Sequence, residues 1–194
     1  MECLNKYQEA IQSYDKAIQL NQNYSQAYYN KGNCLRSLNR PKEAIESYNK
    51  AIQINSKFSQ AYNNKGNAYR DLHRFEDALE SYNKAILIDP SYSGYYNNRG
   101  IALQNLNRLE DALESYDKTI LINSNDSDAY YNRGIAFQNL NRFEDALESY
   151  SKAISINPND TDAYKKKCST LNELKRTDEA TQCFKAIEKT QRNK

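Results

Sequence analysis

Cysteine and histidine, the side chains most often used for metal binding and nucleophilic chemistry, are few in this chain and poorly spaced for either role. The only histidine is His73. The cysteines form no CxxC pair and have no ligand-type spacing to that histidine; they are Cys3, Cys34, Cys168 and Cys183. Zinc sites and disulfide frameworks both need closely spaced sets of such residues. We therefore expect four free thiols, no bound metal and no cofactor.

Paired carboxylates could act as a general acid and a general base, and the chain has three such pairs. The pairs recur at a fixed interval of 34 residues, at Glu76-Asp77, Glu110-Asp111 and Glu144-Asp145. A feature that recurs at a fixed interval belongs to the architecture rather than to one active site. The chain also has no histidine near a nucleophile and no glycine-rich loop that could hold a phosphate. We expect these acids to stabilise the starts of helices, and we expect no enzymatic activity.

Side-chain amides form a third group of candidates. Asparagine recurs at the same interval as the acid pairs, at Asn30, Asn64, Asn98 and Asn132, and Lys166 interrupts the series. An amide both donates and accepts hydrogen bonds, so such a column can pair with the backbone of an extended peptide whatever its sequence. The alternative is that near-identical repeats produce the column automatically, with no role in binding.

For the asparagines to form a column, the structural elements that carry them must repeat at the same interval. Four glycines recur at this interval as well: Gly32, Gly66, Gly100 and Gly134. Within a unit, a segment such as SQAYNNKGNAYRDL opens on serine, a good N-cap, and carries apolar residues at helical spacing. Asparagine often follows its last leucine, where a left-handed residue can end a helix. A segment such as RFEDALESYNKAILI then has acids in its first turn and a lysine near its end. Each unit is predicted to contain two antiparallel helices, named here helix A and helix B.

The chain divides into one incomplete unit and five units of full length. Residues 1-24 supply the end of a helix A and a helix B, and they are followed by 25-58, 59-92, 93-126, 127-160 and a degenerate capping unit, 161-194. Glycine in helix A and alanine in helix B leave room for the two backbones to approach each other. One helix pair buries little surface, so neighbouring pairs must stack. The predicted fold is all-α.

Composition narrows the partner class. The 27 basic and 25 acidic residues leave a net charge of +2, which gives no footprint for nucleic acid or an anionic membrane. The mean hydropathy is -0.99, and no apolar run approaches the roughly 20 residues that span a bilayer. The N-terminal MECLNKYQEAIQ lacks the regions of a signal peptide. We expect a cytoplasmic protein whose partners are other proteins.

The repeat resembles the tetratricopeptide repeat. Residues 62-90, YNNKGNAYRDLHRFEDALESYNKAILIDP, have the family's aromatic residues, Gly, Ala and Pro at the expected places of a 34-residue unit. Position 7, usually Leu in the family, is Lys or Arg in all five full units, so its stem is expected to cover the core. The resemblance implies a right-handed superhelical solenoid whose helices A line a concave groove. The amide column is similar to that in the repeat domain of O-linked N-acetylglucosamine transferase.

Family positions 5, 6, 9 and 12 of helix A identify the residues expected to bind a peptide. They are Tyr29, Asn30, Asn33, Arg36, Asn63, Asn64, Asn67, Arg70, Asn97, Asn98, Ile101, Gln104, Tyr131, Asn132, Ile135 and Gln138. This surface changes from basic and amide-rich to neutral along the chain, which favours an acidic segment at the N-terminal repeats, although Asp71 opposes it. The cations of the family's two-carboxylate clamp for chaperone tails are replaced by Tyr29, Gly94 and Asn98, which disfavours that ligand.

The two ends of the array suggest a second mode of binding. Residues 1-24 provide a helix B whose inner face no helix A covers, so we expect self-association or capture by a partner there. The last unit has polar residues at usually apolar positions, which is typical of a cap. Two functions remain open: a module that binds an extended peptide in its groove, and a structural scaffold subunit packed through its ends and convex face.

Overall fold

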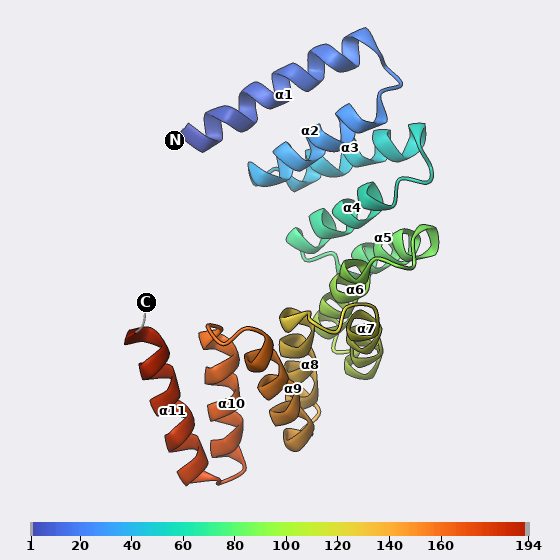
Figure 1. Cartoon of the computed structure of the whole chain (residues 1–194). Coiled ribbons are helices and arrows are strands. Elements are labelled where there is room, and N and C mark those ends of the chain that lie inside the picture. The colour runs from blue at the N-terminus through green and yellow to red at the C-terminus, as the bar shows by residue number, and fades with distance from the viewer. Residues whose placement is uncertain (1, 193–194) are drawn as a thin grey trace. The chain divides into compact units, whose positions relative to one another are not determined.

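The computed structural model describes residues 2–192, and the side chains of residues 5–187. This part of the chain is all-α and contains no β-strand, which confirms the predicted fold class. Its helices are α1 (Glu2–Leu20), α2 (Ser25–Ser37), α3 (Pro41–Ile54), α4 (Ser59–Asp71), α5 (Phe75–Ile88), α6 (Ser93–Asn105), α7 (Leu109–Ile122), α8 (Ser127–Asn139), α9 (Phe143–Ile156), α10 (Thr161–Glu173) and α11 (Thr177–Arg192). Figure 1 follows them from α1, in blue, to α11, in red.

The helices form two compact units. The first unit ends at Ala102 and the second begins at Leu103, so the boundary falls within α6. In the first unit α2 pairs with α3 and α4 with α5, while α1 packs on α2 and α3 on α4. In the second unit α8 pairs with α9 and α10 with α11, while α7 packs on α8 and α9 on α10. Each unit is therefore a stack of antiparallel helix pairs.

A single left-handed residue reverses the chain between the two helices of each pair. These residues are Asn39, His73, Asn107, Asn141 and Lys175, with φ between 56° and 58°. The next residue then bonds back into helix A, as when the Arg40 N–H donates to the Leu35 carbonyl oxygen at 2.9 Å. Asparagine tolerates this conformation well, which explains the predicted turns, and the same geometry also holds His73 and Lys175.

The contact between the two helices of a pair depends on glycine. A Cβ atom at Gly66 would lie 2.5 Å from Cε1 of Tyr82, and one at Gly32 would lie 2.6 Å from Cε1 of Tyr48. Both rings are fully buried. The glycines therefore create the slots that the helix B tyrosines fill, as expected from the small residues of the sequence.

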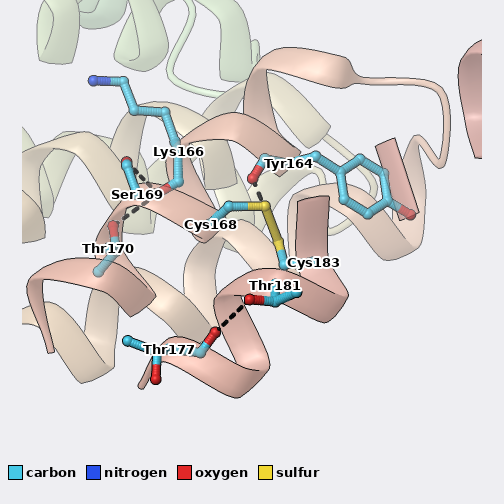
Figure 2. The surroundings of a disulfide bond; sticks show 8 residues. All are labelled: Tyr164, Lys166, Cys168, Ser169, Thr170, Thr177, Thr181 and Cys183. Atoms are coloured by element: carbon cyan, nitrogen blue, oxygen red, sulfur yellow. Dashed lines mark hydrogen bonds between the residues drawn. A yellow bond between two sulfur atoms is a disulfide. The ribbon is translucent and has the colours of Figure 1, made fainter. Parts of the chain in front are cut away.

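The last helix pair is built differently, and here the expectation of four free thiols is wrong. Cys168, at the glycine position of α10, forms a disulfide with Cys183 of α11 (Figure 2). Because the Cys168 side chain fills the slot, the ring of Phe184 is 42% exposed, whereas the equivalent Tyr48 is 0% exposed. Cys183, one residue before that ring, faces the slot instead. The disulfide thus replaces the glycine–tyrosine contact as the link between the two helices.

The other two cysteines take no part in this bond. Cys34 is a free thiol in α2, and partial burial raises its pKa above the ordinary value. The side chain of Cys3 lies outside the described residues. None of the described helices combines the length and the hydropathy needed to cross a bilayer.

Candidate functional site

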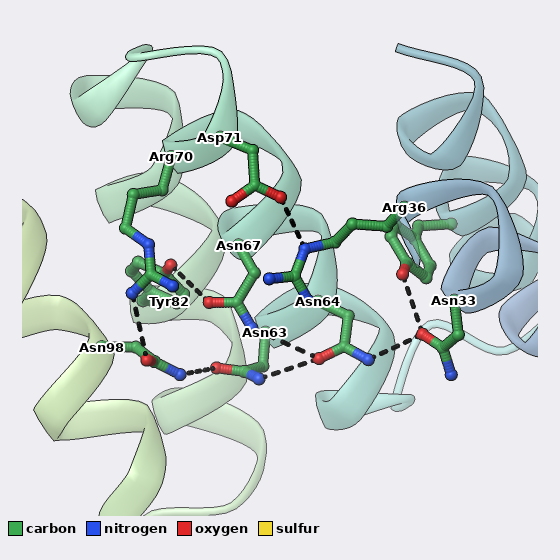
Figure 3. A network of polar contacts seen from close by, with 10 residues as sticks. Asn33, Arg36, Asn63, Asn64, Asn67, Arg70, Asp71, Tyr82 and Asn98 are labelled. Carbon is green, nitrogen blue, oxygen red and sulfur yellow. Dashed lines mark hydrogen bonds and ion pairs between the residues drawn. The ribbon is translucent and has the colours of Figure 1, made fainter. Parts of the chain in front are cut away.

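The amide column of the first unit is a continuous hydrogen-bond network between successive helices A (Figure 3). The Asn64 Nδ2 of α4 donates to Oδ1 of Asn33, at 2.8 Å, and to the hydroxyl oxygen of Tyr29, at 3.0 Å, both in α2. The Asn98 Nδ2 of α6 donates in the same way to Oδ1 of Asn63 in α4, at 2.9 Å. The position 6 amides of Asn64 and Asn98 therefore each link their helix to the helix A before it.

Asn64 is satisfied by these protein contacts alone. Its Oδ1 accepts from Nδ2 of Asn63 at 3.1 Å and, more weakly, from Nδ2 of Asn67 at 3.5 Å. Asn63 and Asn67 are themselves each only 9% exposed. With two donated and two accepted bonds, the Asn64 amide has little capacity left for a ligand. Part of the predicted binding column therefore has a structural role.

Other amides of the predicted site accept hydrogen bonds from buried tyrosines. The Tyr48 hydroxyl donates to Oδ1 of Asn33, and the Tyr82 hydroxyl donates to Oδ1 of Asn67, both at 2.8 Å. Burial raises the pKa of Tyr82 to about 12 and that of Tyr48 further, so both hydroxyls stay protonated and can donate. These partners are required because a buried hydroxyl without an acceptor is costly.

The second unit satisfies its tyrosines from a different position of helix A. The Tyr116 hydroxyl donates to Oε1 of Gln104 at 3.0 Å, and the Tyr150 hydroxyl donates to Oε1 of Gln138 at 2.9 Å. In these repeats position 9 is isoleucine, and the glutamine is at position 12. Repeats with asparagine at position 9 have arginine at position 12, whereas repeats with isoleucine at position 9 have glutamine at position 12. This linked change of two positions is a sequence signal for the tyrosine's acceptor, and it was not among the predictions from the repeat pattern.

The predicted binding residues thus form two groups that belong to different units. The first unit holds the residues of α2, α4 and the start of α6, from Tyr29 to Ile101. The second unit holds Gln104, Tyr131, Asn132, Ile135 and Gln138. In the first group Asn30 accepts from Nε2 of Gln26 at 3.0 Å, and in the second Gln138 donates to Oε1 of Glu173 at 3.1 Å.

Two arginines at position 12 of successive repeats lie beside the amide network. Arg36 Nε donates to Oδ2 of Asp71 at 2.6 Å, which forms an ion pair between α2 and α4. Arg70 Nη1 donates only to Oδ1 of Asn98, at 3.4 Å. Asp71 therefore neutralises the first arginine and not the second (Figure 3).

The three acid pairs lie at the starts of α5, α7 and α9. In each pair the aspartate forms a solvent-accessible ion pair with the arginine three residues before it. The distances are 2.8 Å for Arg74–Asp77, 2.6 Å for Arg108–Asp111 and 2.7 Å for Arg142–Asp145. These contacts match the predicted role of the acids at helix starts.

Cations at position 7 lie on the other side of helix A. Lys31 Nζ lies 2.6 Å from Oδ1 of Asp15, and Arg133 Nε lies 2.8 Å from Oδ1 of Asp117, so each pairs with the helix B before it. An open pocket of about 510 Å³ beside Arg133 carries charges of both signs, including Glu148. Among the described residues, no three His, Cys, Asp or Glu side chains are grouped so that they could hold a metal ion.

Comparisons with known proteins agree with the helix-pair architecture. A family model described as "Tetratricopeptide repeat" matches residues 25–58, 59–92 and 127–160, which is more than half of the chain. A model described as "TPR repeat" matches 4–35 and 105–141, and a further tetratricopeptide-repeat model matches 81–114. No curated protein matches the chain.

Several solved structures are similar along most of their length. A crystal structure of MamA is 25% identical, with a TM-score of 0.78, and the match covers 84% of this chain and 95% of that one. YrrB, described as a TPR protein with an unusual peptide-binding site, is 24% identical, with 92% of each chain covered and a TM-score of 0.74. PilF from Pseudomonas aeruginosa is 17% identical, with 98% of this chain and 91% of that one covered and a TM-score of 0.81. The last two similarities concern the fold alone.

Proposed function

Because the chain belongs to the tetratricopeptide-repeat family, whose repeats serve as protein–protein interaction modules, we propose that it binds an extended segment of another protein along its helices A. The segment would lie across α2, α4 and the start of α6 in the first unit. The proposal contains no catalytic step, because the aspartate of each acid pair is ion-paired with an arginine at a helix start.

The observation that carries this proposal is the set of amide donors that the network leaves unused. In the described part of the chain the Nδ2 atoms of Asn30 and Asn33 have no acceptor, although the Oδ1 atoms of both residues are bonded. Neither nitrogen is among the buried atoms that lack a partner, so both reach solvent. Donors of this kind can pair with the backbone carbonyl groups of an extended peptide. YrrB, a protein of the same fold, is itself described as peptide-binding.

The test must remove a donor without breaking the network. Asn33→Asp does so, because its retained Oδ1 can still accept from Tyr48 and Asn64, while the free NH₂ becomes an oxygen. Short peptides would be selected from a displayed random library on the immobilised protein, and an uncharged selected peptide would be measured by fluorescence anisotropy. We expect a loss of affinity of about tenfold, since a missing donor leaves a peptide carbonyl unpaired.

Asn49→Asp is the matched control. Asn49 is exposed on α3, at the position where other repeats carry Asp15 and Asp117, so an aspartate is accommodated there. It adds the same charge on the side of the helices A that carries the position 7 cations, away from the amide network. Equal affinity of the Asn33→Asp variant and the wild type, or selection of no peptide, would refute groove binding.

A second candidate function, assembly through the N-terminal end, is favoured by the face of α1. Tyr14 is equivalent to Tyr48 but remains half-buried rather than fully buried, and Tyr7 on the same helix is 40% exposed. We infer that this face joins a second copy or another subunit of an assembly. Sedimentation across a concentration series would show association that Tyr14→Lys abolishes, and a monomer at every concentration would exclude association between copies.

A further inference from the structure

Arg70 is the cation of the first unit's network whose charge has no counter-ion. Its equivalent in the previous repeat, Arg36, forms a 2.6 Å ion pair with Asp71 at position 13 of the following repeat. The residue at that position for Arg70 is Asn105, which carries no charge. Within the described chain, Arg70 forms no ion pair and has a single 3.4 Å bond to Asn98.

The groups around Arg70 supply more donors than acceptors. Four amide oxygens are already bonded: Oδ1 of Asn63 accepts from Asn98, Oδ1 of Asn64 from Asn63, Oδ1 of Asn67 from Tyr82, and Oδ1 of Asn98 from Arg70. The guanidinium has five N–H donors, of which one is used. Figure 3 shows Arg70 at the end of this chain of contacts, with its guanidinium beside Asn98 and Tyr82. A ligand that completes the site must therefore bring acceptors.

We propose that Arg70 binds the carboxylate of an aspartate or glutamate in the segment held by the helices A, so that the site selects acidic segments. A carboxylate has the geometry to accept two parallel bonds from a guanidinium, and it would supply the charge that Asp71 supplies to Arg36. This inference rests on the proposed peptide binding and adds the chemistry of the ligand. The proposed site differs from the family's two-carboxylate clamp for chaperone tails. Its arginines are at position 12 of helix A, whereas the cations of that clamp are at positions 2, 5 and 6.

Asp71 determines whether one or both of the arginines beside the network, Arg36 and Arg70, can bind an acidic ligand. Its carboxylate forms the ion pair with Arg36, and it places a negative charge at the residue next to Arg70 in the sequence, which an acidic ligand would meet. Removing this carboxylate frees a second guanidinium and removes a repulsion. Arg70→Gln and Asp71→Asn should therefore change the affinity for an acidic segment in opposite directions.

The experiment uses the full chain and the short peptides selected from the random library. Selected sequences should be enriched in Asp and Glu, and replacing the acidic residue of a selected peptide by its amide should weaken binding about fivefold, the upper range for a solvent-accessible ion pair. Arg70→Gln should bind the acidic peptide and its amide counterpart equally. Asp71→Asn should bind the acidic peptide about two- to fivefold more tightly, and both effects should shrink at high salt.

Arg108→Gln is the matched control, since Arg108 is an exposed arginine in the other unit whose ion pair with Asp111 lies at a helix start. It should leave the affinity unchanged, and circular dichroism should show equal helix content in all variants. Selected peptides without an acidic preference, or a preference that survives Arg70→Gln, would overturn the role of Arg70 while groove binding stands. Selection of no peptide at all would overturn both.

Discussion

The glycine slot gives the sharpest test of how these helix pairs are held together. In Gly66→Ala the new Cβ would lie 2.5 Å from Cε1 of Tyr82, so the ring or the helix must move by about 0.9 Å to reach an ordinary contact of 3.4 Å. The surrounding core leaves no free space for the ring to move into, because Tyr82 is fully buried and its hydroxyl donates to Oδ1 of Asn67 at 2.8 Å. Movement would also break that hydrogen bond.

The expected cost follows from two opposing effects. Overpacking of a tight core costs about 1–3 kcal/mol, and loss of the Tyr82 hydrogen bond adds about 1 kcal/mol. Alanine in place of glycine returns about 1 kcal/mol of helix propensity. The net expectation is a loss of about 2 kcal/mol in the free energy of unfolding. The chain contains a natural precedent, since Cys168 fills the same slot and Phe184 is displaced toward solvent.

Urea unfolding followed by circular dichroism would measure this loss, with Gly94→Ala as the matched control. A Cβ at Gly94 would meet the ring of Tyr92 at 2.6 Å, but that ring is 55% exposed and can swing away. Gly94→Ala should therefore leave the midpoint unchanged or raise it slightly, while Gly66→Ala lowers it. Equal midpoints for the two variants would refute the claim that the slot, rather than glycine as such, holds the pair.

Two further outcomes are expected. Reducing the Cys168–Cys183 disulfide, or replacing both residues by serine, should destabilise the last helix pair by about 3 kcal/mol, the value for a closed loop of about 15 residues; urea midpoints that are the same with and without dithiothreitol would contradict this. Because burial raises the pKa of Tyr82 from 10.0 to about 12, the unfolded state loses this proton first, and stability should fall as pH rises from about 10 to about 12, by roughly 3 kcal/mol for this group. Unfolding curves at pH 9 and pH 11.5 would measure the loss, which Tyr82→Phe should reduce and which a pH-independent midpoint would exclude.

Much of the fold could be predicted because its determinants are local and recur. Gly66 and Tyr82 belong to the same unit, and Asn39 ends a helix through its own backbone preference. The disulfide was not predicted, because the cysteine patterns of metal sites and disulfide frameworks consider only spacing in the sequence and not whether a cysteine occupies the glycine position of a helix pair. Cys168 at the glycine position, followed 15 residues later by Cys183 beside the ring position, is the signal that could have found it.

The candidate site could be predicted only in part. The period places Asn64 and Asn98 in a column, but whether an amide faces a ligand or the previous repeat depends on how successive helices A lie against each other. That arrangement is set by packing between repeats, which no single unit encodes. Asn67 accepts from the Tyr82 hydroxyl, whereas in the next repeat Ile101 stands at the equivalent position and Gln104 accepts from Tyr116 instead. This change can be interpreted only when the positions of the two hydroxyls are known.

The buried tyrosines also make the chain its own optical reporter. It has 17 tyrosines and no tryptophan, so its near-ultraviolet absorption and emission come chiefly from phenol rings. Four helix pairs each contain one fully buried ring bonded to an amide: Tyr48, Tyr82, Tyr116 and Tyr150. The last pair has a phenylalanine at that place and adds no such ring. Each of these four pairs that opens on partial unfolding should therefore reduce the near-ultraviolet dichroism, and the pair of α6 and α7, which also buries Tyr95, should give the largest step.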